Sequence, residues 1–287
     1  MIKPKKLIIF NFLVSFATFT GAYLALASIL NSQSIMQPIL LRPDVGTTEY
    51  YDRASIAGVK RTDLYIPAAD GKKMHAWLFS LPDANKIAIV NHGNAGNISY
   101  RMHIAKALLK AGCSVFMYDY RGYGLSTGSA TMNGILDDGI TVYNYVRNTL
   151  KYDDKHIILY GESIGSGVTC HIASLRSCLG VIIQSGLASI PSTARAQIPL
   201  LSIFPDIVFA QPHFANAEAL SKIHIPVLLI HGKLDHTVAP GESAKMFAIA
   251  NEPKTLIWLD HCGHNDIGDQ DSQLFHESIE NFVRTLH

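Results

Sequence analysis

A serine stands between two glycines in the segment GESIG, residues 161–165. The apolar run 157–160 precedes it and predicts a strand, and residues 168–175 follow with helical spacing. Small residues two before and two after a serine permit a tight strand-to-helix turn that exposes the hydroxyl. The N–H of Ile164 would then point to where negative charge develops during acyl transfer. We interpret Ser163 as a nucleophile and Ile164 as one oxyanion-hole donor.

The general base is chosen from 13 histidines. A serine hydroxyl is a weak nucleophile at neutral pH and needs such a base. When the serine lies on this kind of turn, the chain order is serine, acid, histidine. The segment DHCGHND at residues 260–266 therefore offers His261 and His264. We choose His264, because Gly263 permits a sharp turn that brings the next ring over the nucleophile, and we interpret His261 as a surface or supporting residue. Metal binding by this loop is the alternative, but no HxxxH pair accompanies it and we predict no metal.

The orienting carboxylate is expected on the loop before the one that carries the histidine. Asp235 is the first carboxylate after the apolar run 227–230. A carboxylate there would fix the imidazole tautomer and stabilise the imidazolium. Asp260 and Asp266 are nearer to His264 in sequence, but a triad is assembled in space. We therefore predict Asp235 as the third member.

The loop HGNAGN at residues 92–97 follows the apolar run 87–90. Its small residues let the backbone approach a ligand closely, and we predict the N–H of Asn94 as the second oxyanion-hole donor. The alternative is an ordinary turn capped by Asn94 or Asn97. The loop has no GxxxxGK pattern for binding phosphate, and the chemistry requires no cofactor.

The elements that must position these residues are predicted from alternating apolar runs and helical segments. An antiparallel pair is expected at residues 64–66 and 74–79, and nearly continuous apolar runs predict buried parallel strands at 87–90, 114–118, 157–160, 181–183, 227–230 and 256–259. Helical spacing at 104–111 and 135–146 fits the connections. The pattern predicts an α/β fold with a mostly parallel, doubly wound sheet of about eight strands. Ligands bind such sheets beyond the carboxyl ends of the strands.

The interval 186–222 is longer than one crossover requires and is rich in apolar residues. One interpretation is an additional helix packed on the sheet. The other is a small helical cap, inserted over the active site, that lines a pocket for an acyl chain.

The amino terminus differs from the rest of the chain, because Lys3, Lys5 and Lys6 precede an uncharged run at residues 7–30. About 20 apolar residues suffice to cross a bilayer, so we predict residues 1–32 as a transmembrane anchor. The alternatives are a signal peptide cleaved after residues 25–27 and a buried core helix. The lysines favour a catalytic domain on the translocated side, secreted if the segment is cleaved. Residues 33–55 are predicted as a linker, and residues 56–287 as the catalytic domain.

Composition excludes some functions. Lys and Arg number 24 against 23 Asp and Glu, so the chain lacks the basic surface that nucleic acid requires. The four cysteines have no metal-ligand spacing. A single bridge between Cys170 and Cys178 stays open, because a translocated protein meets oxidising conditions.

Five ordered motifs together resemble the α/β-hydrolase-domain (ABHD-type) serine hydrolases, many of which are membrane-anchored. The motifs are HGNAGN at 92–97, DYRGYGLSTG at 119–128, GESIG at 161–165, HGKLD at 231–235 with Val238, and GHND at 263–266. The resemblance spans residues 60–285 and implies the α/β-hydrolase fold, the triad Ser163, Asp235 and His264, and an oxyanion loop at Asn94. It also implies an amino-terminal membrane segment. His261 and Cys262 stand where the family commonly has small residues.

These observations predict a serine hydrolase that cleaves ester or thioester bonds without a cofactor. The apolar cap and the amino-terminal segment favour a lipid-like acyl substrate. The same triad also suits an amidase or peptidase. The alternative from another class is a non-catalytic member of the fold that binds a ligand. The sequence makes no prediction of the oligomeric state.

Overall fold

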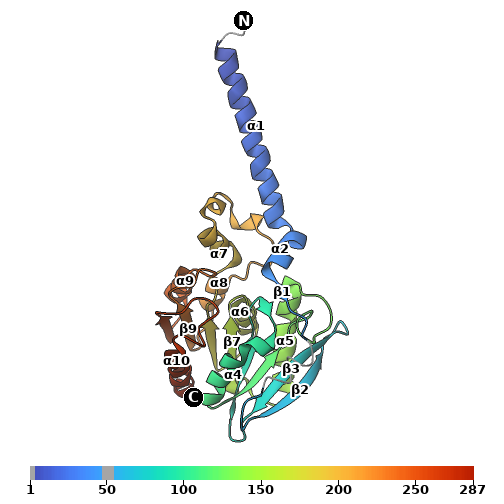
Figure 1. The fold of residues 1–287 in the computed structure, drawn as a ribbon, viewed down its shortest axis with the longest axis vertical. Helices are drawn as coiled ribbons and strands as arrows, with labels where there is room; N and C mark the ends of the chain where they lie inside the picture. Colours follow the sequence, from blue (N-terminus) through green and yellow to red (C-terminus); the bar gives the residue numbers. More distant parts are fainter. Residues whose placement is uncertain (1–3, 47–54) are drawn as a thin grey trace.

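An eight-stranded sheet forms the centre of the molecule (Figure 1). The computed structural model describes residues 4–46 and 55–287, with side chains described from residue 15. The strands of this sheet are β2 (Lys60–Pro67), β3 (Lys73–Ser80), β4 (Lys86–Asn91), β6 (Cys113–Tyr118), β7 (Ile157–Glu162), β8 (Gly180–Gln184), β9 (Val227–Gly232) and β10 (Lys254–Leu259). Their order is β10-β9-β8-β7-β4-β6-β3-β2. The pairs β2–β3 and β3–β6 are antiparallel, and neighbours from β10 to β6 run parallel. The predicted α/β-hydrolase fold, with about eight mostly parallel strands, is confirmed.

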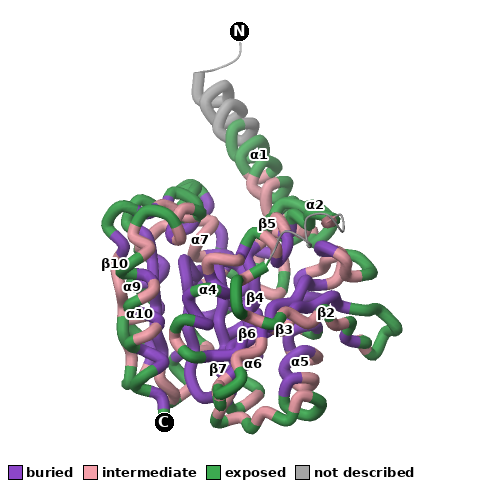
Figure 2. The backbone as a smooth tube through the Cα atoms, turned by 60° about the horizontal axis from the view of Figure 1, so that its bottom comes forward, coloured by how far each residue is buried: buried purple, intermediate pink, exposed green. Residues whose placement is uncertain are grey.

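Helices cover both faces of the sheet, so the strands at the centre are buried (Figure 2). These helices are α4 (Met102–Lys110), α5 (Met132–Asn148), α6 (Gly165–Leu175), α8 (Asn216–Leu220), α9 (Gly241–Ile249) and α10 (Ser272–Thr285).

Successive strand residues alternate between two apolar cores. Ile89 and Leu159 belong to the core that contains side chains of α5 and α6. Val90 and Tyr160 belong to the core that contains side chains of α4 and α10. A strand buried on both faces needs apolar side chains at every position, which explains the nearly continuous apolar runs in the sequence.

The interval 186–222 folds into short helices at the base of α1 (Pro4–Asn31) (Figure 1). Phe204 and Phe209 are buried with Leu30, and the rings of Tyr23 and Phe204 stack with centroids 4.5 Å apart. The end of α1 therefore packs on this interval. Besides α8, the interval contains α7 (Ile190–Gln197), η3 (Pro199–Ile203) and η4 (Asp206–Val208).

Helix α1 extends away from the sheet (Figure 1). Within the described part of the chain, no helix is long and apolar enough to cross a membrane. The predicted transmembrane anchor is therefore not supported. The last turn of α1 contributes the buried Leu30 to the fold. The location of the catalytic domain on a translocated side stays a prediction.

Residues 33–44, here called the arm, fall in the predicted linker but fold onto the catalytic domain. The arm contains α2 (Gln33–Leu40) and β1 (Arg42–Pro43). Strand β1 pairs in parallel with the short strand β5 (Ala95–Gly96). Leu41, between α2 and β1, is buried in the core beside α5 and α6. Residues 47–54, also predicted as linker, lie outside the described residues.

All four cysteines are buried free thiols. The bridge between Cys170 and Cys178 that the sequence left open is therefore not formed. Burial raises the pKa of the Cys178 thiol to about 12, so this thiol is protonated at neutral pH.

Candidate active site

Ser163 lies on the turn between β7 and α6, with a φ of +53°. This left-handed conformation is unusual for a residue with a side chain. A hydrogen bond from the Ser163 N–H to the Gln184 carbonyl, 2.9 Å long, holds it. A Cβ on Gly165 would lie 2.1 Å from the Asn91 carbonyl oxygen, and a Cβ on Gly161 would lie 2.6 Å from a side-chain oxygen of α6. Both glycines are therefore required for the turn to pack against its surroundings.

The structure brings together the three predicted triad residues. His264 Nε2 lies 3.0 Å from Ser163 Oγ, and His264 Nδ1 lies 2.6 Å from Asp235 Oδ2. Because an ionised carboxylate only accepts hydrogen bonds, Nδ1 carries the proton and Nε2 can accept the serine proton. The three side chains come from loops after β7, β9 and β10, at the carboxyl ends of parallel strands.

Asp235 is held as an ionised acceptor. Its Oδ1 accepts hydrogen bonds from the N–H groups of Thr237 and Val238, each 2.8 Å long. Burial alone would raise the pKa of the Asp235 carboxyl, but the hydrogen bonds from His231 and His264 outweigh burial and lower this pKa below its usual range. Asp235 therefore stays charged at neutral pH and can stabilise an imidazolium.

The competing residues of the last loop have other partners. His261 is on the surface, with its side chain 78% exposed, and its Nδ1 lies 3.0 Å from Asp271 Oδ1. Asp260 forms a 2.7 Å ion pair with Lys233. Asp266 accepts a hydrogen bond from within its own loop. Each of these three side chains therefore has a partner outside the triad.

The chain turns before His264, but the conformation of Gly263 is not the reason for this turn. Gly263 has no left-handed backbone, and a Cβ there would meet no atom closer than 3.5 Å. The Gly263 N–H instead donates a 2.6 Å hydrogen bond to the Asp266 carboxylate, which closes the turn. The crowded glycine is Gly232, where a Cβ would lie 2.4 Å from the Cys262 carbonyl oxygen. The close approach of β9 to the histidine loop therefore depends on Gly232.

The loop after β4 lies beside the nucleophile. Asn94 and Ile164, the two predicted oxyanion donors, line the same cavity as Ser163. The Asn94 carbonyl accepts hydrogen bonds from the Arg42 N–H and from the Tyr123 hydroxyl, each 2.8 Å long. These bonds fix the peptide carbonyl of Asn94. The DYRGYG motif and the arm therefore both support the predicted oxyanion loop.

A buried ion pair lies next to the nucleophile, and sequence reasoning missed it. Arg101 is the last residue of η1 (Ile98–Arg101), and its Nε lies 2.8 Å from Glu162 Oε2. The same oxygen accepts a 2.9 Å hydrogen bond from the Gly93 N–H. Burial would raise the pKa of Glu162, but Arg101 and this hydrogen bond lower it to about 2. The charged Glu162 inside the GESIG motif indicates that a buried partner is needed. The sequence does not identify this partner, because Arg101 is 61 residues away.

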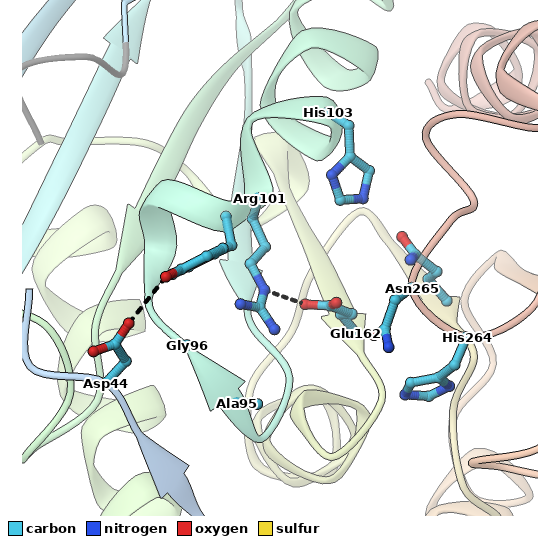
Figure 3. Close-up of a pocket in the computed structure, with 10 residues that line it drawn as sticks. Asp44, Ala95, Gly96, Arg101, His103, Glu162, His264 and Asn265 are labelled. Carbon is cyan, nitrogen blue, oxygen red and sulfur yellow. Dashed lines mark hydrogen bonds and ion pairs between the residues drawn. The ribbon is translucent and has the colours of Figure 1, made fainter. Parts of the chain in front are cut away.

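Two cavities meet the triad from different sides. A cavity of about 190 Å³ contains Ser163 and is lined by apolar side chains such as Leu187 and Val238. A second cavity, of about 400 Å³, contains His264 and is lined by polar groups that include Arg101 and Glu162. Figure 3 shows this polar cavity, with the Arg101–Glu162 pair in its wall. Within residues 4–46 and 55–287, no group of three or more His, Cys, Asp or Glu side chains could hold a metal ion.

Comparisons with known proteins identify relatives in sequence and in fold. Residues 82–216 match the family model described as serine aminopeptidase S33. The YfhR protein of Escherichia coli strain K12 is 32% identical over 225 residues, which cover 75% of this chain and 78% of that protein. The α/β-hydrolase domain-containing protein 17C of Xenopus tropicalis is 30% identical over 189 residues, which cover 65% of this chain and 58% of that protein. An esterase from Pyrococcus furiosus is 19% identical and has the same fold, with a TM-score of 0.69 over 86% of this chain and 98% of that one.

Proposed function

We propose a serine ester hydrolase activity for this chain, which belongs to the α/β-hydrolase superfamily and, within it, to the family of the YfhR proteins. The substrates are carboxylic esters or thioesters. The acyl group enters the apolar cavity beside Ser163, and the alcohol or thiol leaves through the polar cavity beside His264.

The reaction follows from the roles of the three side chains. Ser163 Oγ attacks the carbonyl carbon while its proton passes to His264 Nε2, and Asp235 stabilises the imidazolium that forms. The N–H groups of Asn94 and Ile164 hold the oxyanion of the tetrahedral intermediate. His264 then protonates the leaving group, and a water molecule activated by His264 hydrolyses the acyl-serine.

The observation that carries this proposal is the continuous hydrogen-bonded chain from Ser163 through His264 to Asp235, with bonds of 3.0 and 2.6 Å. The positive φ of Ser163 supports it, because strained backbone at a nucleophile is typical of a functional site. A non-catalytic binding protein would have no need of this complete arrangement.

A fluorophosphonate probe and a p-nitrophenyl ester test the proposal. We expect Ser163→Ala to abolish labelling and to reduce turnover by about 10⁴- to 10⁶-fold. Ser174→Ala is the matched control, because Ser174 is exposed on the helix that follows the nucleophile. A folded wild-type protein that neither takes up the probe nor hydrolyses the ester would refute the assignment.

Aminopeptidase activity is the second candidate, and the description of the matching family model favours it. An aminopeptidase needs a negative group to bind the substrate ammonium. In the polar cavity Glu162 is already paired with Arg101, which favours the ester hydrolase. Asp44 accepts a hydrogen bond from the neutral Tyr100 hydroxyl and is therefore the carboxylate of this cavity that an ammonium group could contact. Comparing alanine p-nitroanilide with p-nitrophenyl butyrate separates the two activities, since hydrolysis of the anilide alone would favour the aminopeptidase.

A further inference from the structure

The arm presents two different faces around α2. Met36 and Leu40 are four residues apart and therefore lie on the same face of the helix. Both line the apolar cavity that contains Ser163. Ile35 and Ile39 have the same spacing but face outward, with 43% and 52% of their surfaces exposed. One helix thus offers an apolar pair at the active site and a matched apolar pair in solvent.

The arm is attached to the domain at several points. The Arg42 N–H donates to the Asn94 carbonyl at 2.8 Å, and the Asp44 N–H donates to the Gly96 carbonyl at 3.2 Å. Leu41 is only 4% exposed. At the other end, Gln33 Nε2 donates a 3.1 Å hydrogen bond to the Gln211 carbonyl. These contacts hold α2 against the cavity.

Helix α7 and the chain after it complete the cavity. Ile190 and Ala194 of α7 line it, together with Phe209. Its volume of about 190 Å³ is close to that of the roughly 150 Å³ apolar cavity that accommodates benzene in an engineered protein. The space therefore suits an acyl chain of short to medium length. A palmitoyl chain would require the walls to separate.

Building on the proposed function, we infer that the arm is a wall of the acyl-binding site and that Met36 and Leu40 set its limit on chain length. The preferred substrates are esters or thioesters of short- to medium-chain fatty acids. Each methylene that fits in the cavity raises kcat/KM about fourfold, because its burial is favourable. Beyond the limit set by Met36 and Leu40, further methylenes lower kcat/KM, because they fit only if the walls separate.

A series of p-nitrophenyl esters tests this inference on the chain of 287 residues. The series runs from acetate through butyrate, hexanoate and octanoate to dodecanoate. We expect the wild-type kcat/KM to rise from acetate, reach a maximum at butyrate to octanoate, and then fall. Met36→Trp and Leu40→Trp fill the cavity, so each should lower the octanoate-to-acetate ratio of kcat/KM by about 10-fold or more. Met36→Ala enlarges the cavity and should move the maximum to a longer ester.

Ile39→Trp is the control for a tryptophan on the exposed face of α2, and it should leave the chain-length profile unchanged. Labelling by a fluorophosphonate establishes that each variant keeps a folded active site. If Met36→Trp, Leu40→Trp and Met36→Ala all keep the wild-type profile while they hydrolyse acetate, the role of the arm is overturned and the ester hydrolase stands. If the wild-type chain hydrolyses none of the esters and takes up no probe, the proposed function itself falls.

Discussion

On one side of Ser163 the active site is built from the loops that follow β4, β7, β9 and β10, and on the other side the arm and α7 form an apolar wall. The first side, here called the strand-end half, is held by hydrogen bonds and by the buried Arg101–Glu162 ion pair. The second, here called the arm–cap half because it joins the arm to α7 and the chain after it, meets the cavity with apolar side chains such as Met36 and Phe209.

The difference between the halves separates two properties of the enzyme. Hydrogen bonds and ion pairs are directional and set the positions of atoms within tenths of an ångström. Apolar packing depends chiefly on volume and tolerates substitutions that preserve it. We therefore expect changes in the strand-end half to reduce the rate for every ester, and changes in the arm–cap half to alter which ester is preferred.

The largest effect is expected from Asp235→Asn. The substituted amide can donate to His264 Nδ1 and so favours the wrong imidazole tautomer, which should lower kcat by about 10⁴-fold. The loss should be equal for all esters of the series, because Asp235 acts on the base and not on the acyl chain. Asp260→Asn is the control, since Asp260 is 61% exposed and pairs with Lys233. A loss that depended on chain length would contradict the separation of the halves.

The next effect concerns stability. Arg101→Met leaves the buried Glu162 carboxylate without its cation and should lower the free energy of unfolding by about 3–5 kcal/mol. The double variant Arg101→Met with Glu162→Gln removes both charges and should recover much of that loss. Urea unfolding measures both values, and Glu280→Gln at an exposed pair with Arg284 should cost less than about 1 kcal/mol. Equal or greater destabilisation of the double variant would argue against a buried charge as the cause.

Acid should destabilise the protein through His92 in the strand-end half. Burial first, and then the charge of Arg101, lower the pKa of His92 from 6.5 to about 4. The unfolded chain therefore binds a proton that the folded chain does not, and the free energy of unfolding falls as the pH drops from 6.5 to 4. The contribution is about 3 kcal/mol. Urea unfolding at pH 7, 5 and 4 should show this decline, and His92→Gln should flatten it. A pH profile unchanged by His92→Gln would exclude this histidine as the source.

The smallest effect tests the contact between the halves. Arg42→Pro removes the N–H that donates to the Asn94 carbonyl, so the loop that carries the predicted oxyanion donor loses one support. We expect kcat to fall by about 10-fold, with little change in KM, because a misplaced donor weakens binding of the transition state. Arg42→Ala keeps the N–H and should retain the wild-type kcat. Equal kinetics for the two variants would show that this hydrogen bond does not position the loop.

Local patterns identified most of the strand-end half. The GESIG turn, the apolar run before it and the order serine, acid, histidine led to Ser163, Asp235 and His264, which the structure brings within hydrogen-bonding distance. The three residues lie close together because parallel strands place their carboxyl ends at one edge of the sheet. The reasoning about Gly263 failed, because the crowding that matters falls on Gly232, the last residue of β9.

The amino-terminal region was the least predictable from the sequence. Its apolar run suggested a transmembrane anchor, which the described helices do not support. The polar stretch after it was predicted as a linker, yet α2 and β1 lie in it. Short segments of this kind have little structure of their own, and they fold here because they pair with the loop after β4 and cover apolar side chains.

The sequence by itself thus determined the sheet and the nucleophile turn, because each depends on periodicity or on glycines within a few residues. It predicted the triad from the order of three motifs along the chain. Only the tertiary structure decided that Glu162 pairs with Arg101 and that Met36 and Leu40 line a cavity at Ser163. These features arise from contacts between residues far apart in the chain. No local pattern encodes them, since their energy appears only when the chain has closed around its core.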